Sequence, residues 1–240
     1  IKPDNEYEDA CIRFIERIFT DPENNRFLGS FRVFQKKTAF YGMFNSLTQT
    51  LLKIASPGVP DFYQGTDLWE LTFVDPDNRG TIDFEPRKNM LERIRAQQHR
   101  LADYAQELLK SPQDGCVKLF LIHRALQARK AHPALFLDGT YKPLTIEGPY
   151  AENIIGFSRT YGNDWAICLA PRFLTKLISD PVLPLGKKIW KDSSFALPDK
   201  APQSFTDAIT GRTISIGTHA EVGSIFESFP GALLIASSNR

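Results

Sequence analysis

The sequence has little of what several classes of protein require. Its 240 residues include only three cysteines, Cys11, Cys116 and Cys168, an odd number whose wide spacing fits neither a disulfide framework nor paired zinc ligands. No apolar run approaches the roughly 20 residues of a transmembrane helix. Because 29 basic and 28 acidic residues leave a net charge of +1, no strong field attracts nucleic acid or an acidic membrane. We therefore expect a cytoplasmic protein that binds a neutral partner.

Motifs of several common catalytic chemistries are also missing. The sequence contains no Gly-x-Ser-x-Gly elbow, no Rossmann or P-loop glycine pattern, no Cys-x-x-Cys and no His-Glu-x-x-His. These absences argue against nucleophilic and metal enzymes. The four histidines are isolated along the chain and are interpreted as surface or packing residues: His99, His123, His132 and His219.

The chain begins Ile1-Lys2-Pro3, without an initiator methionine or an apolar signal core. A helical pattern starts within a few residues, with Asp4 or Asn5 as its N-cap. We therefore expect the sequence to be a piece of a longer polypeptide.

The hydrophobic pattern predicts an α+β fold. Helical periodicity dominates residues 1–133, and Pro133 is expected to end the last helix. The second helix is expected to break near Gly29-Ser30 or Lys36, and residues 59–63 are expected to form a short strand. The helical stretches are predicted near 4–19, 27–54, 86–108 and 115–130.

Residues 134–240 have a different hydrophobic pattern, in which short apolar or alternating runs are separated by turn residues. Six or more such strands in about 105 residues predict an antiparallel β-sandwich. We place the boundary between the two domains near residue 133. The expected strands are 141–146, 154–160, 165–170, 194–197, 212–216, 224–226 and 232–236.

The helix predicted at 115–130 carries both apolar and basic side chains. Its cations are interpreted as a face exposed to solvent, because lysine and arginine are rarely buried. These residues are Lys118, Arg124, Arg129 and Lys130.

Residues 57–70 place carboxylates, an amide and aromatic rings in one short stretch. Carboxylates and amides bond to the vicinal hydroxyls of a sugar, and an aromatic ring packs against its C–H face. The stretch is therefore a candidate saccharide site. Composition alone slightly favours the alternative, in which Phe62 and Trp69 are core residues and the acids cap turns. The candidate residues are Asp61, Tyr63, Gln64 and Asp67.

A second acidic loop follows at residues 74–83, and it begins like a calcium-binding loop. Asp75 and Asp77 hold the first and third ligand positions and Asn78 follows, but Arg79 occupies the fifth and Pro86 the twelfth, which excludes an EF-hand site. We expect Arg79 to pair with carboxylates and to stiffen the loop. One or two acids then stay available to a ligand.

A complete glycosidase pair is not expected within this chain. Asp75 with Asp77, or Asp67 with Glu70, are close in sequence. The two carboxylates of a glycosidase must serve opposite faces of one sugar ring, so they usually come from separate strands.

The segment SPGVPDFYQGTDLW at residues 56–69, followed by VDPDNR at 74–79, resembles the maltooligosyltrehalose synthase family of the α-amylase superfamily. Further similarity occurs at residues 45–53, 139–144, 170–172 and 229–234, so the resemblance spans nearly the whole chain. It implies a (1→4)-α-D-glucan 1-α-D-glucosylmutase of trehalose biosynthesis. Such an enzyme isomerises the reducing-end α-1,4 bond of a maltooligosaccharide to an α,α-1,1 bond and uses no metal or organic cofactor.

The family's three catalytic carboxylates lie on barrel strands that this sequence lacks, so the resemblance implies no catalytic residue here. The resemblance implies that the chain is the carboxyl-terminal portion of the enzyme, inactive alone. Its helical half would then be the remnant of the end of a (β/α)8 barrel, with residues 59–63 as the last barrel strand. Barrel enzymes bind ligands on the loops after their strands, so Asp61, Tyr63, Gln64 and loop residues 75–79 would line the sugar site. Asp67 replaces a glutamate that is common in the family.

The expected partners are a maltooligosaccharide and the missing amino-terminal barrel. Without that barrel, residues 59–63 and the apolar faces around Phe40, Phe44 and Leu51 would have to repack or dimerise. One alternative is another α-glucan hydrolase or transglycosylase of the superfamily. The other is a non-catalytic carbohydrate-binding module that uses Trp165 or Trp190.

Overall fold

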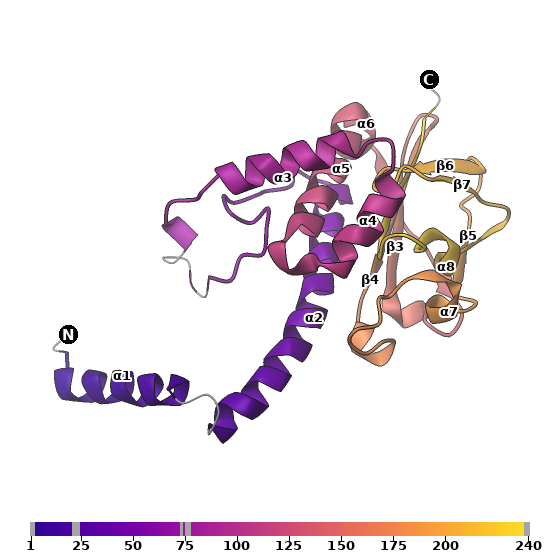
Figure 1. Cartoon of the computed structure of the whole chain (residues 1–240). Helices are drawn as coiled ribbons and strands as arrows, with labels where there is room; N and C mark the ends of the chain where they lie inside the picture. The colour runs from indigo at the N-terminus through magenta and orange to yellow at the C-terminus, as the bar shows by residue number, and fades with distance from the viewer. Residues whose placement is uncertain (1–2, 21–24, 73, 75–77, 238–240) are drawn as a thin grey trace. The chain divides into compact units, whose positions relative to one another are not determined.

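The computed structural model describes residues 3–20, 25–72, 74 and 78–237 (Figure 1). The chain forms two compact units, residues 1–42 and residues 43–240, which are described separately. In the described part of the chain, no helix is long and apolar enough to cross a membrane.

Helix α1 (Asn5–Phe19) begins where the sequence predicts. Asp4 is its N-cap, and its carboxylate accepts a hydrogen bond from the Tyr7 amide at 3.1 Å. Glu6 and Glu8 lie in the first turn and Arg17 in the last, which complements the helix dipole.

Helix α2 (Arg26–Ala55) is continuous, so the predicted break near Gly29-Ser30 or Lys36 is wrong. The Ser30 hydroxyl donates to the carbonyls of Arg26 and Phe27 at 3.2 and 3.0 Å, and these bonds stay within the helix. One glycine costs a helix only about 1 kcal/mol, which 30 residues can absorb.

Many large apolar side chains of residues 1–42 are exposed. Phe44 and Leu51, which the sequence placed on an unpartnered face, are instead buried, with about 1% of each surface accessible. The exposed residues of the first unit are Tyr7, Ile12, Phe14, Ile15, Phe19, Phe27, Phe31, Val33 and Phe34.

In the described residues, four more α-helices precede the first strand. Helix α5 is buried along its first half, with Val117, Phe120 and Leu121 fully inaccessible. Pro133 begins a short helix rather than only ending one, because its fixed φ suits the first turn. The helices are α3 (Glu85–Ala96), α4 (Leu101–Lys110), α5 (Cys116–Ala131) and α6 (Pro133–Leu137).

The expected strand at residues 59–63 does not form. A strand requires a partner that completes its ladder of hydrogen bonds. Here the carbonyls of Gly58 and Asp61 accept from Arg129 and Lys53 instead. Side chains thus replace the ladder in this segment.

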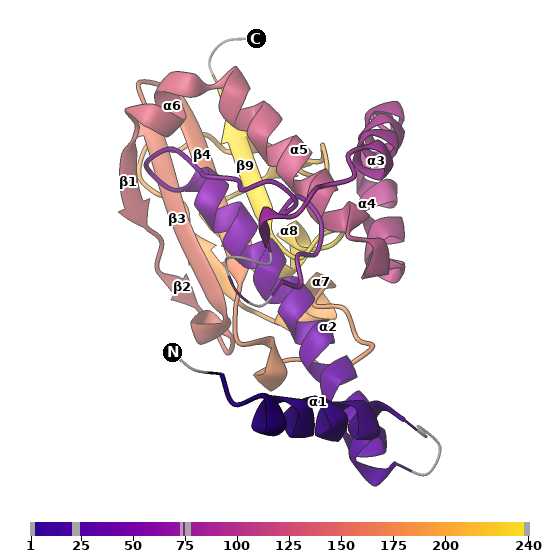
Figure 2. The same ribbon diagram turned by 90° about the vertical axis from the view of Figure 1, so that its left-hand side faces the viewer.

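Two antiparallel sheets follow, and they confirm the α+β class. The larger has the order β1-β3-β4-β9-β6-β7 and the smaller the order β2-β5-β8. Strands β1, β3, β4 and β9 of the larger sheet lie side by side in Figure 2. The strands are β1 (Thr140–Pro143), β2 (Ile146–Glu147), β3 (Ile154–Tyr161), β4 (Asp164–Pro171), β5 (Ser194–Ala196), β6 (Ser204–Asp207), β7 (Thr213–Ser215), β8 (His219–Glu221) and β9 (Ala232–Ala236).

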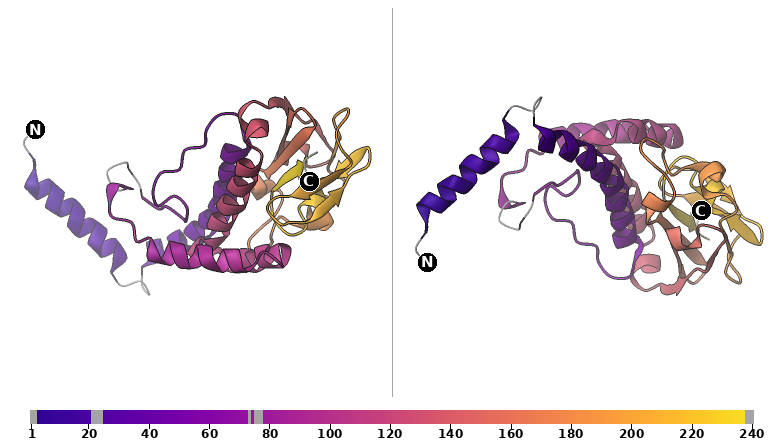
Figure 3. Two further views of the ribbon diagram at one scale, coloured as in Figure 1. Left: turned by 90° about the horizontal axis from the view of Figure 1, so that it is seen from above. Right: turned by 90° about the horizontal axis from the view of Figure 1, so that it is seen from below.

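The centre of the larger sheet forms the core. Six successive residues at the end of β4 and four of β9 are buried, so both faces of these strands are covered. Helices α3 and α5 lie on one side of β3 and β4, and β5, α7 and α8 lie on the other side (Figure 1). Figure 3 shows the same chain from above and from below.

Several short elements of the described residues differ from the sequence prediction. Strands β6 and β8 were not predicted, and the strand expected at 224–226 lies at the end of helix α8 (Val222–Ile225). Val222, Ile225 and Phe226 are all buried at helical spacing. Apolar runs this short do not distinguish helix from strand. Helix α7 (Gly186–Trp190) was also not predicted.

Arg159 on β3 connects the helices to the sheet, although only 1% of its surface is accessible. Its guanidinium donates to the carbonyls of Thr140 and Gly139 at 3.0 and 2.9 Å. It also donates to Phe136 at 3.1 Å and to Ala55, the last residue of α2, at 3.3 Å. Burial lowers the pKa of Arg159 from its usual value.

We predict that Arg159→Met lowers the free energy of unfolding by about 3 kcal/mol or more, because several buried carbonyls lose a charged donor. Chemical denaturation measures the change. Arg172→Met is the control, since its partly exposed guanidinium has one main-chain contact, at Glu152, and should cost about 1 kcal/mol. A loss at Arg159 no larger than the control would contradict this role.

Candidate functional site

The candidate sugar-binding loop begins where α2 ends. Pro57 follows the helix, and Gly58 has a φ of +97°, which favours glycine. Arg129 of α5 donates to the carbonyls of Ile54 and Ser56 at 2.6 and 3.4 Å, and also to that of Gly58. These bonds satisfy carbonyls that a helix end leaves without partners.

Lys53, in the last turn of α2, holds the next part of the loop. Its ammonium donates to the Asp61 carbonyl at 2.7 Å and lies 3.9 Å from the centre of the Phe62 ring. The position of Phe62 is therefore set by a cation–π contact as well as by the main chain.

A turn at residues 63–68 forms the tip of the loop. The Tyr63 carbonyl accepts from the Thr66 amide at 3.1 Å and from its hydroxyl at 2.6 Å. Gly65 has a φ of +89°, and a Cβ there would lie 3.0 Å from both Glu70 Oε2 and Ile82 Cδ1. The turn therefore requires glycine at this position.

Arg87 of α3 binds the same turn. Its guanidinium donates to the Gly65 carbonyl at 3.3 Å and to the Asp83 carbonyl at 2.9 Å. Its Nε lies 2.8 Å from Asp67 Oδ2. The Asp67 carboxylate, a predicted sugar ligand, is thus paired within the protein.

The end of the loop rests on α5. Trp69 Nε1 donates to the Pro112 carbonyl at 2.6 Å. Lys118 Nζ donates to the Leu68 carbonyl at 3.0 Å and lies 5.9 Å from the Trp69 ring centre. Burial, which leaves 8% of Lys118 accessible, and the nearby charge of Lys53 lower its pKa.

The interpretation of the α5 cations as a solvated face is therefore wrong for most of them. Lys118 is buried, and Arg124 and Arg129 bind carbonyls of distant segments, with Arg124 Nε 2.9 Å from that of Ala208. Lys130 is exposed, as predicted. A signal was present in the sequence, because Lys118 stands between the apolar neighbours of a continuous buried run.

The other predicted ligands differ in their surroundings. Asp61, Tyr63 and Gln64 are exposed, with 44% of Tyr63 accessible. Asn78 is partly buried, and its Oδ1 has no hydrogen-bond partner among the described residues. Arg79 is exposed, while Asp75 and Asp77 lie outside the described residues.

The second loop meets the first through Ile82, whose side chain contacts the Gly65 position. The role of the second loop as a sugar ligand stays a prediction.

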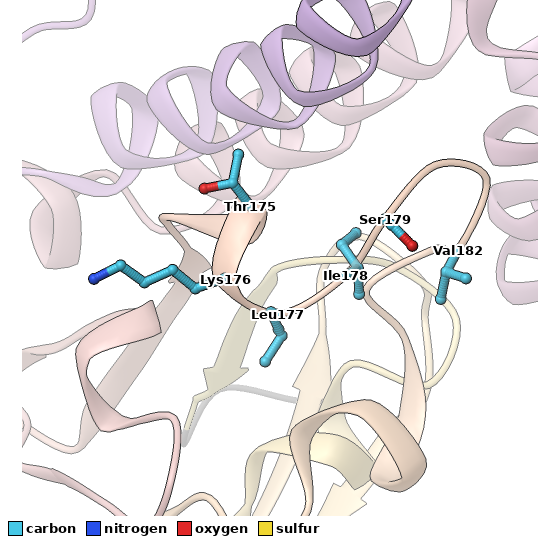
Figure 4. A pocket seen from close by; sticks show the side chains of 6 residues that line it. All are labelled: Thr175, Lys176, Leu177, Ile178, Ser179 and Val182. Carbon is cyan, nitrogen blue, oxygen red and sulfur yellow. The ribbon is translucent and has the colours of Figure 1, made fainter.

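Two other places on the protein are candidates for a binding site: Trp190, which the alternative of a carbohydrate-binding module uses, and a surface depression. Trp190 is fully buried, with its Nε1 donating to the Pro184 carbonyl at 2.8 Å, so it is not a binding platform for a glucan. A shallow depression lies between β4 and α7 (Figure 4), and it is lined by Thr175, Lys176, Leu177, Ile178, Ser179 and Val182. It contains none of the predicted ligands. In the part of the chain that the structure describes, no three His, Cys, Asp or Glu side chains are grouped as metal ligands.

No family model matches the sequence. The chain is 32% identical over 191 residues to a Mycobacterium tuberculosis protein that is named as a maltooligosyl trehalose synthase. The same match occurs in two strains of that organism. The match covers 80% of this chain and 20% of that protein. The chain thus spans about a fifth of the length of the curated relatives it matches.

Solved structures agree with the sequence match. The maltooligosyltrehalose synthase from Arthrobacter ramosus is 30% identical with a TM-score of 0.74, and the match covers 99% of this chain and 27% of that one. A second solved maltooligosyl trehalose synthase is 28% identical with a TM-score of 0.65, over 98% of this chain and 27% of the other.

The chain has the α+β fold of one part of a much longer enzyme, because nearly all of it matches about a quarter of each solved structure. The particular relatives are maltooligosyltrehalose synthases. The resemblance to their carboxyl-terminal portion, which the segments at 56–69 and 74–79 indicated, is confirmed.

We predict that Gly115→Ala disturbs the loop. Gly115 has a φ of +76°, and a Cβ there would lie 3.0 Å from the Trp69 amide nitrogen and 3.1 Å from Leu68 Cβ. Alanine therefore costs about 1–2 kcal/mol in backbone conformation, with a clash added. Gly162→Ala is the matched control, because its φ is +58° and the space around it is open. Equal losses of unfolding free energy in the two variants would show that the close approach is unimportant.

Proposed function

We propose that this chain is the carboxyl-terminal part of a (1→4)-α-D-glucan 1-α-D-glucosylmutase of trehalose biosynthesis. The observation that carries the proposal is the similarity of 80–99% of the chain to 20–27% of polypeptides named maltooligosyltrehalose synthase. The bond-breaking carboxylates belong, in this proposal, to the part of the polypeptide that precedes Ile1. The chain alone is then inactive, and no cofactor takes part.

The proposed contribution of this chain is part of the sugar-binding rim. Asp61, Tyr63 and Gln64 offer a carboxylate, an aromatic ring and an amide from a main chain that is held by other residues. Such groups suit a neutral, hydroxyl-rich ligand. Asp67 serves this rim through its ion pair with Arg87 rather than by binding sugar.

Asp75, Asp77, Asn78 and Arg79 are proposed to complete the rim from the second loop. We also propose a division into a helical domain at 1–133 and a β-domain at 134–240. It is supported by the change from helix α6, which ends at Leu137, to strand β1, which starts at Thr140. A cytoplasmic location is supported by three cysteines that are all free thiols.

The apolar side chains of residues 1–42 are proposed to contact the rest of the polypeptide, as a partner in the same chain. Among the described residues of this unit, nine large apolar side chains are exposed, and exposed apolar surface of this kind marks interaction sites. A second copy of this chain is the alternative partner when the rest is missing.

The activity test compares this chain with the longer polypeptide encoded together with it. Incubated with maltopentaose, the chain alone should leave the number of reducing ends unchanged. The longer polypeptide should remove reducing ends without releasing an equal amount of glucose, because an α,α-1,1 bond has no reducing end. Conversion by the chain alone would refute the assignment of the catalytic groups, and release of glucose and maltose without non-reducing products would favour a hydrolase.

The rim is tested by Tyr63→Ala in the longer polypeptide. We expect the KM for maltopentaose to rise about tenfold if the ring packs on a sugar. The free energy of unfolding should change by no more than about 0.5 kcal/mol, because Tyr63 is exposed. An unchanged KM would remove Tyr63 from the site.

A further inference from the structure

Four cations bind main-chain carbonyls at nearly regular intervals along the candidate loop. They come from three helices, α2, α3 and α5, which lie around the loop. The pairs are Arg129 with Gly58, Lys53 with Asp61, Arg87 with Gly65, and Lys118 with Leu68.

The two lysines enclose the part of the loop that carries the predicted sugar ligands. Lys53 binds the carbonyl of Asp61 at the start, and Lys118 binds that of Leu68 at the end. Each ammonium also lies near an aromatic ring of the loop, Phe62 at 3.9 Å and Trp69 at 5.9 Å. Both the main chain and the rings at each end are thus held by a positive charge.

Lys118 is the more informative of the two because it is buried. Removing an ammonium from water is costly unless it is compensated, and here the Leu68 carbonyl accepts from it at 3.0 Å. The charges of Asp67 and Glu70 favour the ammonium, whereas burial and the charge of Lys53 lower its pKa. A methionine of similar length would fill the space without that cost. The cation therefore has a use that packing alone does not explain.

The two lysines bind carbonyl oxygens while the side chains of Asp61, Tyr63 and Gln64 stay exposed. Main chain held in this way keeps ligand-binding groups in one geometry before the ligand arrives, which lowers the entropic cost of binding. A loose rim would let a small bound sugar exchange with water.

We propose that Lys53 and Lys118 are positioning residues of the sugar-binding rim, and that the fixed rim determines whether the sugar released in the reaction is retained. This inference rests on the proposed function and assigns it two residues that do not touch the substrate.

The reaction products show whether the released glucose is retained. Cleavage of the reducing-end α-1,4 bond leaves a glycosyl group on the enzyme and one free glucose. If that glucose stays, its anomeric hydroxyl takes the glycosyl group, its proton passes to the enzyme's base, and the α,α-1,1 bond forms. If the glucose leaves, water takes the glycosyl group, and the products are glucose and a shortened maltooligosaccharide.

The experiment measures the ratio of glucose to non-reducing product from maltopentaose in the longer polypeptide. Lys118→Met and Lys53→Met should each raise this ratio about fivefold or more. Lys118→Arg, which keeps a cation, should give a ratio closer to that of the parent protein. Lys130→Met is the matched control, the same change at an exposed position of α5, and should leave the ratio unchanged.

A variant that is merely less stable would lose both products in proportion, so an unchanged ratio overturns the inference. Because Lys53 is exposed, Lys53→Met keeps the test valid if Lys118→Met does not fold.

A second measurement on the 240-residue chain needs no sugar. Thermolysin cleavage between residues 58 and 72 should become about tenfold faster in Lys118→Met and Lys53→Met but not in Lys130→Met. Faster cleavage with an unchanged product ratio would contradict the proposed location of the sugar site. Unchanged cleavage would contradict the positioning role itself, whatever the function.

Discussion

Arginine and lysine side chains donate to carbonyl oxygens at the end of α2 and along the following loop, and the arrangement of residues 43–240 depends on these bonds. A helix end leaves its last carbonyls unpaired, and here that end lies inside the protein. Arginine and lysine side chains from other elements supply the donors, with Arg159 and Arg129 on the last turn. Bonds to charged donors are stronger than bonds between neutral groups, which compensates for burying the cations.

These contacts join the helical region to the β-region. Arg159 extends from the sheet to the end of α2, and Arg129 extends from α5 to the same turn. Contacts from both regions therefore fix the end of α2, where the loop begins. Asp67, read from the sequence as a sugar ligand, belongs to this system of contacts through Arg87. The ion pair with Arg87 fixes this carboxylate within the loop, and its role as a sugar ligand stays a prediction.

Much of the fold follows from the sequence, and two of the wrong predictions share a cause. Periodicity located the long helices, and Asp4 marked the start of α1. Residues 59–63 were taken for a strand because their apolar pattern fits one, but a strand depends on a partner that local sequence does not contain. Lys118 was taken for a surface residue for the same reason, since its acceptor lies 50 residues away. The family resemblance is visible in the sequence because each of its motifs, at residues 56–69 and 74–79, is a continuous segment.

Helix α5 contributes both Lys118 and Arg129, which bind opposite ends of the loop. At 1.5 Å per residue, their 11-residue separation corresponds to roughly 16 Å along the axis and about three turns, so both emerge from one side of the helix. The spacing of these two cations along α5 therefore fixes the distance between the two ends of the loop. Adding one residue between them would rotate one cation by about 100° relative to the other, so length variation in this helix is compatible with the loop only in steps close to whole turns.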